Sequence, residues 1–483
     1  MTDNELKQAC YGDDVPIAAF ATAPGSGALT LIRCSGKNSI LLFSPVFSNV
    51  KIIDAAGNTV IHGSIIKKGG KKEAVDEVLV SVFRAPKSYT GEDSLDICCH
   101  GGFIAGNAVM DVLRETGFRA ALPGEFTFRA FMNGKLDLTR SESVMELVNA
   151  KTETGRRHAV SRLSGSLEKE INYIKNLLVQ TLASSEIYLD YSEDEVSADD
   201  KDEIEGILPN RSIALDALSR LKKLSASWQM ERIYQEGITL VIAGPPNAGK
   251  SSLFNLLLKE ERSIVTEIPG TTRDWIEAWV SIKGIPMRII DTAGLRETSD
   301  TVEKIGVDRS FSLLKEADIV LYLIDGECGI SNDDIKYISD MHFDAGNGEK
   351  NHTSYIFVWN KSDITLPQSP FPAENISLIC VSVKNNTGLN ELYTAVTAVV
   401  YKKAGSNLQL EDSAALGTAR QKKLIDAAYS SLDEALAMSE QKIPLDLIAP
   451  LLREAVNSLG EITGEVSAAD ILEEMFSKFC VGK

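Results

Sequence analysis

Apolar residues occur along this chain in two patterns, short continuous runs and stripes at helical spacing. Near the amino terminus the runs are short, and turn-forming residues such as Pro24 and Gly25 separate the first two. Runs of this length bounded by glycine or proline are typical of β-strands. Four of them occupy residues 17–22, 28–33, 61–67 and 78–83, and the last two are predicted to form a hairpin with a longer loop.

Helical spacing dominates two later regions. Positions three and four residues apart share one face of a helix, so an apolar stripe predicts a helix with that face in a core. The first stripe consists of Leu163, Leu167, Ile171, Ile174, Leu178 and Leu182, and the second of Ile448, Leu451, Leu452, Ala455, Leu459 and Ile462. The acidic stretch of residues 193–203 follows the first stripe and is expected to be an exposed loop, because so many like charges repel.

Strand and helix patterns alternate between the two stripes. The buried-strand runs lie at residues 238–243, 289–290, 319–324, 355–359 and 378–381. Such alternation predicts a parallel sheet covered by helices on both faces, with ligand bound at the carboxyl ends of the strands. We therefore expect an α+β domain at residues 1–137, a discontinuous helical domain at residues 138–236 and 403–483, and an α/β domain at residues 237–402 inserted into it.

The first strand of the inserted domain leads directly into a phosphate-binding loop. Gly244-Pro245-Pro246-Asn247-Ala248-Gly249-Lys250-Ser251 fits the pattern G-x-x-x-x-G-K-[ST]. In such a loop the backbone N–H groups cradle the α- and β-phosphates, the lysine reaches the β- and γ-phosphates, and the hydroxyl contacts Mg²⁺. Nucleotide contacts are thus predicted for Asn247, Ala248, Gly249, Lys250, Ser251 and Ser252, and Lys250 also stabilises charge during hydrolysis.

Two further motifs at strand ends identify the nucleotide as GTP. Asp291, which Thr292, Ala293 and Gly294 follow, can hold Mg²⁺ through water. Asn360-Lys361-Ser362-Asp363 ends another strand, and its aspartate can accept both hydrogen bonds that guanine offers and adenine does not. Ser382-Val383-Lys384 follows the next strand and is expected to close over guanine through a backbone N–H, which a valine can supply as well as any residue.

The segment between the phosphate loop and Asp291 is expected to close over the γ-phosphate. Thr272 in this segment is the predicted second protein ligand of Mg²⁺. Leu295 occupies the position of the water-orienting glutamine of Ras-like proteins, and its aliphatic side chain cannot orient water. Glu303 lies downstream, where spacing alone favours a solvated loop charge. The predicted GTP contacts in this segment are Thr266, Glu267, Ile268, Pro269, Gly270, Thr271 and Thr272.

Composition limits the class of protein. The chain has 483 residues, 44% of them hydrophobic and 24% charged, as expected for a globular protein of about three domains. No apolar run approaches the roughly 20 residues of a membrane helix and the first residues do not resemble a signal peptide, so a cytoplasmic or organelle-matrix location is expected. The seven cysteines lack C-x-x-C spacing, which favours neither a disulfide framework nor a structural zinc site. The formal net charge of −18 argues against broad nucleic-acid binding, so an RNA would be held by local basic patches or by another subunit.

Motifs at both ends of the chain resemble one family. The segment Cys480-Val481-Gly482-Lys483 resembles the carboxyl terminus of the MnmE (TrmE) family of tRNA-modification GTPases, which usually ends Cys-Ile-Gly-Lys. Further matching segments are Gly91-Glu92-Asp93, His100-Gly101-Gly102, Pro123-Gly124-Glu125-Phe126, Lys135-Leu136-Asp137-Leu138 and Gly460-Glu461-Ile462-Thr463-Gly464-Glu465. The resemblance covers essentially the whole chain. It implies an α+β folate-binding-like first domain, a helical domain and an inserted Ras-like P-loop GTPase domain.

The resemblance implies that the first domain binds a tetrahydrofolate one-carbon derivative. Carried over by position, the folate contacts would be Arg33, Asp96, Lys135 and Lys483, with Asp96 where the family usually has glutamate. Arginine and lysine suit the carboxylates of a folate, and a carboxylate suits the N–H donors of a pterin. From the residues alone, surface pairing of Arg33 and Lys135 and a capped strand end at Asp96 are the alternatives. Cys480 is the family's terminal cysteine, and a nucleophile role there requires positively charged surroundings.

The resemblance also implies K⁺-stimulated hydrolysis by a homodimer whose GTPase domains pair across the nucleotides. Asn247 would bind K⁺ through its side chain, Thr266, Ile268 and Thr271 would supply further oxygens, and Glu303 would be the catalytic acid. With an FAD-containing partner resembling MnmG (GidA), such a protein would use GTP and the one-carbon unit to install an aminomethyl-type group at C5 of the wobble uridine of certain tRNAs. The alternative is a regulatory or ribosome-assembly GTPase that binds RNA without modifying it.

Overall fold

The structure is a computed structural model. It describes residues 15–23, 25–67, 73–190, 208–260, 276–291, 317–332, 334–336, 353–367, 378–405, 414–465 and 469–482. Contacts divide the chain into two compact units. The first consists of Met1–Met145, Arg162–Lys222 and Arg420–Lys483, and the second of Glu146–Ser161 and Lys223–Ala419. Among the described residues each unit contains one six-stranded sheet.

The sheet of the first unit has the strand order β3-β4-β5-β2-β1-β6. Its strands are β1 (Ile17–Phe20), β2 (Leu29–Ser35), β3 (Thr59–Ile66), β4 (Ala74–Phe83), β5 (Ser94–His100) and β6 (Arg119–Ala120). β3 and β4 pair antiparallel, which confirms the hairpin that the sequence predicts. β6 pairs parallel with β1 at the edge of the sheet.

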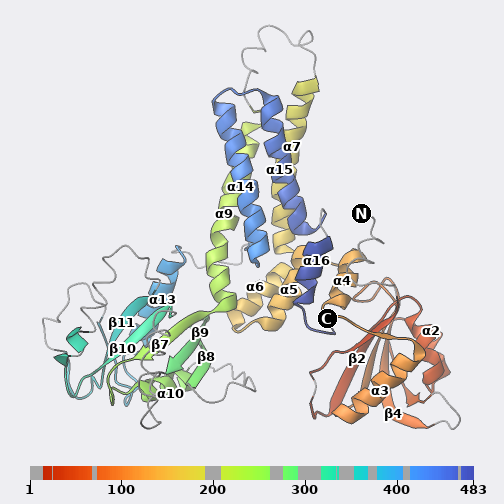
Figure 1. Cartoon of the computed structure of the whole chain (residues 1–483), viewed down its shortest axis with the longest axis horizontal. Coiled ribbons are helices and arrows are strands. Elements are labelled where there is room, and N and C mark those ends of the chain that lie inside the picture. Colours follow the sequence, from red (N-terminus) through yellow and green to blue (C-terminus); the bar gives the residue numbers. More distant parts are fainter. Residues whose placement is uncertain are drawn as a thin grey trace, which may run out of the picture. The chain divides into compact units, whose positions relative to one another are not determined.

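The two faces of this sheet have different neighbours. Ile32, Val80 and Ile97 lie on one face and form a buried core with residues of α2 and α3, and α3 crosses that face in Figure 1. On the other face α4 packs Phe126 against the apolar side chains of β1. Because side chains alternate along a strand, Arg33 and Asp96 lie on this second face. The helices here are α2 (Ser39–Phe43), α3 (Phe103–Thr116) and α4 (Glu125–Met132), with short 3-10 helices η1 (Ser44–Val46) and η2 (Val50–Ile52).

Long helices follow the first sheet in the sequence. They are α5 (Leu138–Asn149), α6 (Glu153–Leu163), α7 (Ser166–Asp190), α9 (Arg211–Glu236), α14 (Ala419–Glu440), α15 (Leu445–Thr463) and α16 (Ala469–Ser477). α7 packs along α15 (Figure 1). The first predicted stripe is not one helix, because Leu163 ends α6 and the other members lie on α7. Gly165 between them has φ +90°, a left-handed conformation that ends a helix.

The sheet of the second unit has the order β12-β11-β10-β7-β9-β8. Its strands are β7 (Ile238–Ala243), β8 (Ile276–Ile282), β9 (Ile285–Asp291), β10 (Ile319–Asp325), β11 (Ser354–Asn360) and β12 (Leu378–Cys380). The pairs are parallel, as the sequence predicts, except that β8 runs antiparallel to β9. The helices α10 (Lys250–Glu260) and α13 (Leu389–Lys403) bury Leu253 and Val396 in one core with the side chains of a single sheet face.

No helix among the described residues combines the length and the apolar character needed to cross a membrane.

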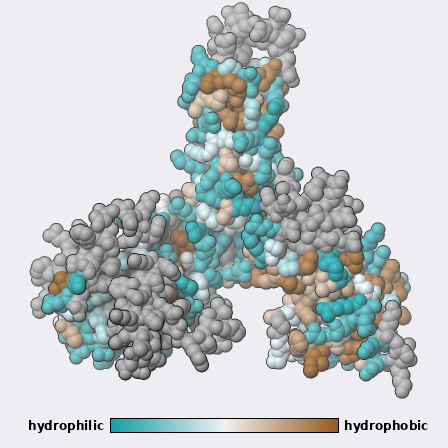
Figure 2. Space-filling model, viewed as in Figure 1, coloured by the Kyte–Doolittle hydropathy of each residue, from teal (hydrophilic) through white to brown (hydrophobic). Residues whose placement is uncertain are grey.

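Hydrophilic and hydrophobic side chains are intermingled on the visible face of the long helices (Figure 2). Their apolar positions lie mainly inward, as shown by the buried Ile171, Leu432 and Leu452.

Candidate functional site

The phosphate loop joins β7, the fourth strand in the order of its sheet, to the first turn of α10. A Cβ atom at Gly249 would lie 2.3 Å from the side-chain nitrogen of Asn360, and the residue has φ +93°. Only glycine satisfies both conditions without strain. Asn247 has φ +65° and is exposed, whereas Ala248 is buried. The loop is therefore a tight turn with an exposed asparagine near its tip.

Lys250 and Ser251 begin α10, and their side chains turn toward the loop and the neighbouring strand. The Lys250 ammonium donates to the carbonyls of Gly244 at 3.0 Å and Pro245 at 2.8 Å. The Ser251 hydroxyl donates to the carboxylate of Asp291 at 2.7 Å. Asp291 is the buried last residue of β9, which pairs with β7. The structure thus brings together the lysine, the hydroxyl and the carboxylate that the motifs predict.

The Ser251–Asp291 pair fits a magnesium ion bound with a nucleotide. Mg²⁺ prefers oxygen ligands and is usually held by one or two protein groups together with substrate phosphates. The hydroxyl and the carboxylate supply such oxygens beside the phosphate loop. Within the described ranges no three or more His, Cys, Asp or Glu side chains form a cluster that can hold a metal on their own.

Asn360 connects the phosphate loop with the segment expected to close over guanine. It ends β11, its side-chain nitrogen donates to the Ala248 carbonyl at 2.8 Å, and its side-chain oxygen accepts from the Val383 N–H at 3.3 Å. Asn360 is buried, so these bonds replace the water that its amide would otherwise bind. One amide therefore fixes both loops relative to each other.

Lys361 and Asp363 follow Asn360 and project toward different partners. The Lys361 ammonium donates to Asp325 at 2.8 Å and to Glu327 at 3.1 Å, and these hydrogen bonds raise the pKa of Lys361. Asp363 is exposed and accepts from the Ser382 hydroxyl at 2.6 Å, a bond that lowers the pKa of the Asp363 carboxyl. The aspartate is therefore ionised and open to solvent, as an acceptor for guanine N–H groups requires. Ser362 and Lys384 lie in the same two loops.

Several predicted site residues lie outside the described residues. They are Thr266, Glu267, Ile268, Pro269, Gly270, Thr271, Thr272, Thr292, Ala293, Gly294, Leu295, Glu303 and Lys483. β8 begins after Thr272, and β9 ends just before Thr292.

On the first sheet, Arg33 and Asp96 face each other across β2 and β5. They occupy paired positions, and the guanidinium donates two hydrogen bonds to the carboxylate, at 3.0 and 3.3 Å. Their side chains are 26% and 20% exposed, so each keeps one open side. The alternative of a capped strand end at Asp96 is wrong, because Asp96 lies in the middle of β5. Arg33 does form the pairing that the residues alone suggest, and its partner is the other candidate folate contact.

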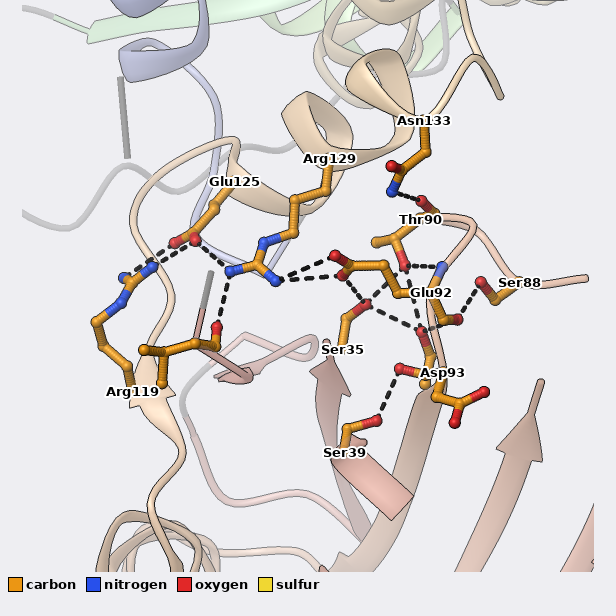
Figure 3. Close-up of polar contacts among 12 residues, drawn as sticks. Ser35, Ser39, Ser88, Thr90, Glu92, Asp93, Arg119, Glu125, Arg129 and Asn133 are labelled. Carbon is orange, nitrogen blue, oxygen red and sulfur yellow. Dashed lines mark hydrogen bonds and ion pairs between the residues drawn. The ribbon is translucent and has the colours of Figure 1, made fainter. Parts of the chain in front are cut away.

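A loop of residues 84–93 borders this pair and is held by a network of polar contacts (Figure 3). The buried Arg129 of α4 donates to Glu92 at 3.2 Å and to Glu125 at 2.9 Å. Asn133 donates to the Thr90 carbonyl at 2.7 Å. A charge as deeply buried as that of Arg129 requires partners, and Glu92 and Glu125 supply them. The Lys135 ammonium donates to the Pro86 carbonyl of the same loop at 3.0 Å.

The end of α16 and the segment after it pack against α4. The Gly124 N–H donates to the Cys480 carbonyl at 3.4 Å, and the Phe476 ring meets the Phe128 ring edge-on at a centroid distance of 5.4 Å. The Cys480 side chain is exposed. A Cβ atom at Gly482 would lie 2.2 Å from the carbonyl oxygen of Phe20, at the end of β1. Gly482 thus lies against β1, the strand next to β2, which carries Arg33.

The sheet of the second unit and its loops define the class of this protein. A phosphate loop after a central parallel strand, an aspartate at the end of the neighbouring strand and an Asn-Lys-x-Asp segment at the end of a third form the nucleotide-binding domain of a Ras-like P-loop GTPase.

Comparison with known proteins identifies the family. Residues 138–480 match the MnmE helical domain, and residues 16–135 match the GTP-binding protein TrmE N-terminus. The tRNA modification GTPase MnmE of Treponema denticola is 43% identical over 97% of this chain and 98% of its own. Those of Borreliella afzelii and Alkaliphilus oremlandii are 40% and 38% identical, over 97% and 98% of this chain and 98% and 100% of their own. The chain belongs to the MnmE family of tRNA modification GTPases.

Sequence reasoning missed two features of these sites. The first is the pair Asp325 and Glu327, which accept hydrogen bonds from Lys361. Asp325 ends the apolar strand β10 and Glu327 follows it, so acidic residues at the end of an apolar run were the signal that could have found them. The loop of residues 84–93 gave no periodicity, and only its end, Gly91-Glu92-Asp93, was noted as a match to the family. Its place beside Arg33 depends on strand pairing between residues far apart in the sequence.

Proposed function

We propose that this chain is a K⁺-stimulated GTPase that modifies C5 of the tRNA wobble uridine together with an FAD-containing partner resembling MnmG. The one-carbon unit comes from a tetrahydrofolate derivative, and the product carries an aminomethyl-type group. The protein acts as a homodimer in the cytoplasm. Family membership and the two candidate sites support the proposal.

In the nucleotide site, Lys250 and Ser251 hold the β- and γ-phosphates and Mg²⁺, and Asp363 selects guanine. The Lys250 ammonium now contacts carbonyls of its own loop, so a phosphate oxygen would replace them as acceptor. Thr272 supplies the second protein oxygen for Mg²⁺. Because Leu295 cannot orient water, Glu303 acts as the acid or base that positions the attacking water.

Asn247 is the proposed K⁺ ligand. Asn247 is exposed near the tip of the phosphate loop, so its amide oxygen is open to a cation. Potassium supplies the positive charge that an arginine finger supplies in other GTPases. Backbone oxygens at Thr266, Ile268 and Thr271 would supply further ligands.

In the first unit, Asp96 accepts hydrogen bonds from the pterin ring, and Arg33, which is bonded to Asp96, contacts the same end of the folate. Lys135 binds the carboxylates of the folate. Lys483 adds a further cation. Its neighbour Gly482 packs against Phe20, and Phe20 pairs with Ile32, the residue before Arg33. Cys480, held next to this strand end, is the proposed nucleophile or thiolate.

The observation that carries the proposal is the docking of the cysteine-bearing tail. The Gly124–Cys480 hydrogen bond and the close approach of Gly482 to Phe20 keep an exposed thiol on the same domain as Arg33 and Asp96. A GTPase that only binds RNA has no need of an exposed thiol anchored in this way. The GTP-binding loops belong to the other compact unit, so hydrolysis acts on this chemistry through a change of conformation.

Nucleoside analysis of tRNA tests the function. In a strain that lacks this chain, the C5-modified wobble uridine should disappear and should return when the chain is supplied, but not when its Cys480→Ser variant is supplied. Normal wobble uridine in the deletion strain would exclude the proposed reaction.

Folate binding discriminates against the alternative of a regulatory or ribosome-assembly GTPase. Such a protein has no reason to bind 5-formyltetrahydrofolate. We expect saturable binding by the purified chain and its loss in the Arg33→Ala variant, measured by titration calorimetry.

A further inference from the structure

Tyr89 lies beside the Arg33–Asp96 pair and has no part in the chemistry described so far. The centre of its ring is 5.8 Å from the Arg33 guanidinium carbon. Its hydroxyl shares a 2.9 Å hydrogen bond with the hydroxyl of Thr127, which is buried on α4. Arg33 is in turn bonded to Asp96, the candidate acceptor for the pterin, at 3.0 Å. Asp96, Arg33 and the Tyr89 ring therefore lie side by side.

The loop that carries Tyr89 is anchored on both sides of the ring. Before it, the Pro86 carbonyl accepts from Lys135. After it, Thr90 accepts from Asn133, and Glu92 accepts from the buried Arg129 (Figure 3). These bonds order a loop that has no regular secondary structure. The tyrosine ring is therefore held in place before any ligand arrives, which lowers the entropic cost of binding against it.

One part of the ring remains open to solvent. The residue is 38% exposed, although its hydroxyl is already bonded. Burial raises the pKa of Tyr89, so the phenol is neutral at physiological pH. A neutral aromatic face beside a carboxylate and a guanidinium suits a flat heterocycle with N–H groups along its edge. The heterocycle can stack on the tyrosine ring while its N–H groups donate to the carboxylate.

We propose that Tyr89 is a stacking residue of the folate site and that it contacts the flat pyrimidine half of the pterin held by Asp96. The inference rests on the proposed function and adds a residue and a ring assignment to it. Lys135 is assigned to the glutamate end of the folate, because an ammonium group suits the carboxylates there.

Titration calorimetry with 5-formyltetrahydrofolate and the full chain tests the assignment. Replacing Tyr89 by leucine removes the aromatic face and should weaken binding roughly tenfold. Tyr89→Phe keeps the face and should bind within about threefold of the unmodified chain. An unchanged Kd in Tyr89→Leu would overturn the proposal.

A matched control is Tyr173 on α7. Tyr173 is 46% exposed and stacks with the Arg220 guanidinium at 4.5 Å, so it offers the same pairing of residue types without Asp96. Tyr173→Leu should leave folate affinity unchanged. An equal loss in both variants would show a general loss of integrity and would contradict a specific role for Tyr89.

The number of glutamates on the folate separates the ring from the tail. Tyr89→Leu should cause the same fold-loss for a folate with one glutamate and for one with three, because the ring is identical. Lys135→Ala should cause a larger loss with three. If the Tyr89→Leu loss grew with the number of glutamates, the ring would be placed at the wrong end of the ligand.

Two outcomes distinguish this inference from the proposed function. If the unmodified chain does not bind folate, both fail. If it binds and Arg33→Ala weakens it while Tyr89→Leu does not, only the Tyr89 assignment fails. Should Tyr89→Leu not fold, Tyr89→Trp provides the decisive measurement, since stacking would quench the added indole on folate addition. Quenching no greater than in the unmodified chain would reject stacking.

Discussion

The ammonium nitrogen of Lys151 lies 3.6 Å from the centre of the Trp279 ring. The same nitrogen donates to the carbonyl of Glu236, the last residue of α9, at 3.1 Å. Lys151 lies between α5 and α6, and Trp279 lies on β8. One side chain therefore joins the α5–α6 corner, the end of α9 and the edge strand of the nucleotide-binding sheet, all within the second unit.

Replacing Lys151 by methionine should loosen this joint. The cation–π contact and the hydrogen bond are lost while the aliphatic stem is kept, so we expect local opening at the end of α9 to become about 1 kcal/mol easier. Hydrogen exchange in peptides that cover residues 230–237 should then be roughly fivefold faster. Lys283→Met is the control, because the exposed Lys283 ammonium donates to the Thr394 hydroxyl and lies on the turn between β8 and β9. Equal acceleration in both variants would contradict a specific joint at Lys151.

Hydrolysis of GTP should be faster in KCl than in NaCl by roughly tenfold or more, since K⁺ is proposed to stabilise transition-state charge. Asn247→Gly should abolish the difference. Glycine tolerates the φ of +65° at this position, so the variant removes the side chain without adding strain. Asn58, which has φ +60° in the first unit, provides the matched control as Asn58→Gly. Potassium stimulation that survives in Asn247→Gly would rule out the side chain as a ligand.

Gly482→Ala should displace the cysteine-bearing tail. An added Cβ would meet a backbone oxygen at 2.2 Å, and φ +93° disfavours any other residue. A misplaced reactive group lowers a rate by roughly tenfold to a hundredfold, so tRNA modification should fall while GTP hydrolysis changes little. The rate at which Cys480 is alkylated should change as well. Mass spectrometry measures this rate against the exposed Cys328 as internal reference. Gly25→Ala, where no atom lies within 4 Å of the added carbon, should behave like the unmodified chain.

His100 should titrate above its ordinary range. Its ring nitrogen Nδ1 is 2.6 Å from Asp76, and this hydrogen bond raises the pKa of His100 above 6.5. Because the folded-state value is the higher one, the pair stabilises the end of β5 fully below pH 6.5 and loses that contribution as pH rises through the folded-state pKa. NMR titration of the imidazole checks the direction. In Asp76→Asn the midpoint should move down toward 6.5, and an unchanged midpoint would show that another group sets it.

The order of motifs predicted much of the nucleotide site. Phosphate loops and Asn-Lys-x-Asp segments are read locally, because their function depends on backbone shape over a few residues. The pattern of apolar runs likewise predicted the parallel sheet and the β3–β4 hairpin. The antiparallel β8 and the helix break at Gly165 were not predicted, since a single residue's φ or one strand's direction leaves little trace in periodicity.

By itself, the sequence determined that this chain is a P-loop GTPase of the MnmE type, because those motifs are contiguous and specific. Only the tertiary structure decided that Asp96 pairs with Arg33, that the Tyr89 ring lies beside the same guanidinium, and that Gly482 packs against Phe20. These contacts join residues tens to hundreds of positions apart. Strand register and close backbone approach fix them, and neither can be read from the order of residues along the chain.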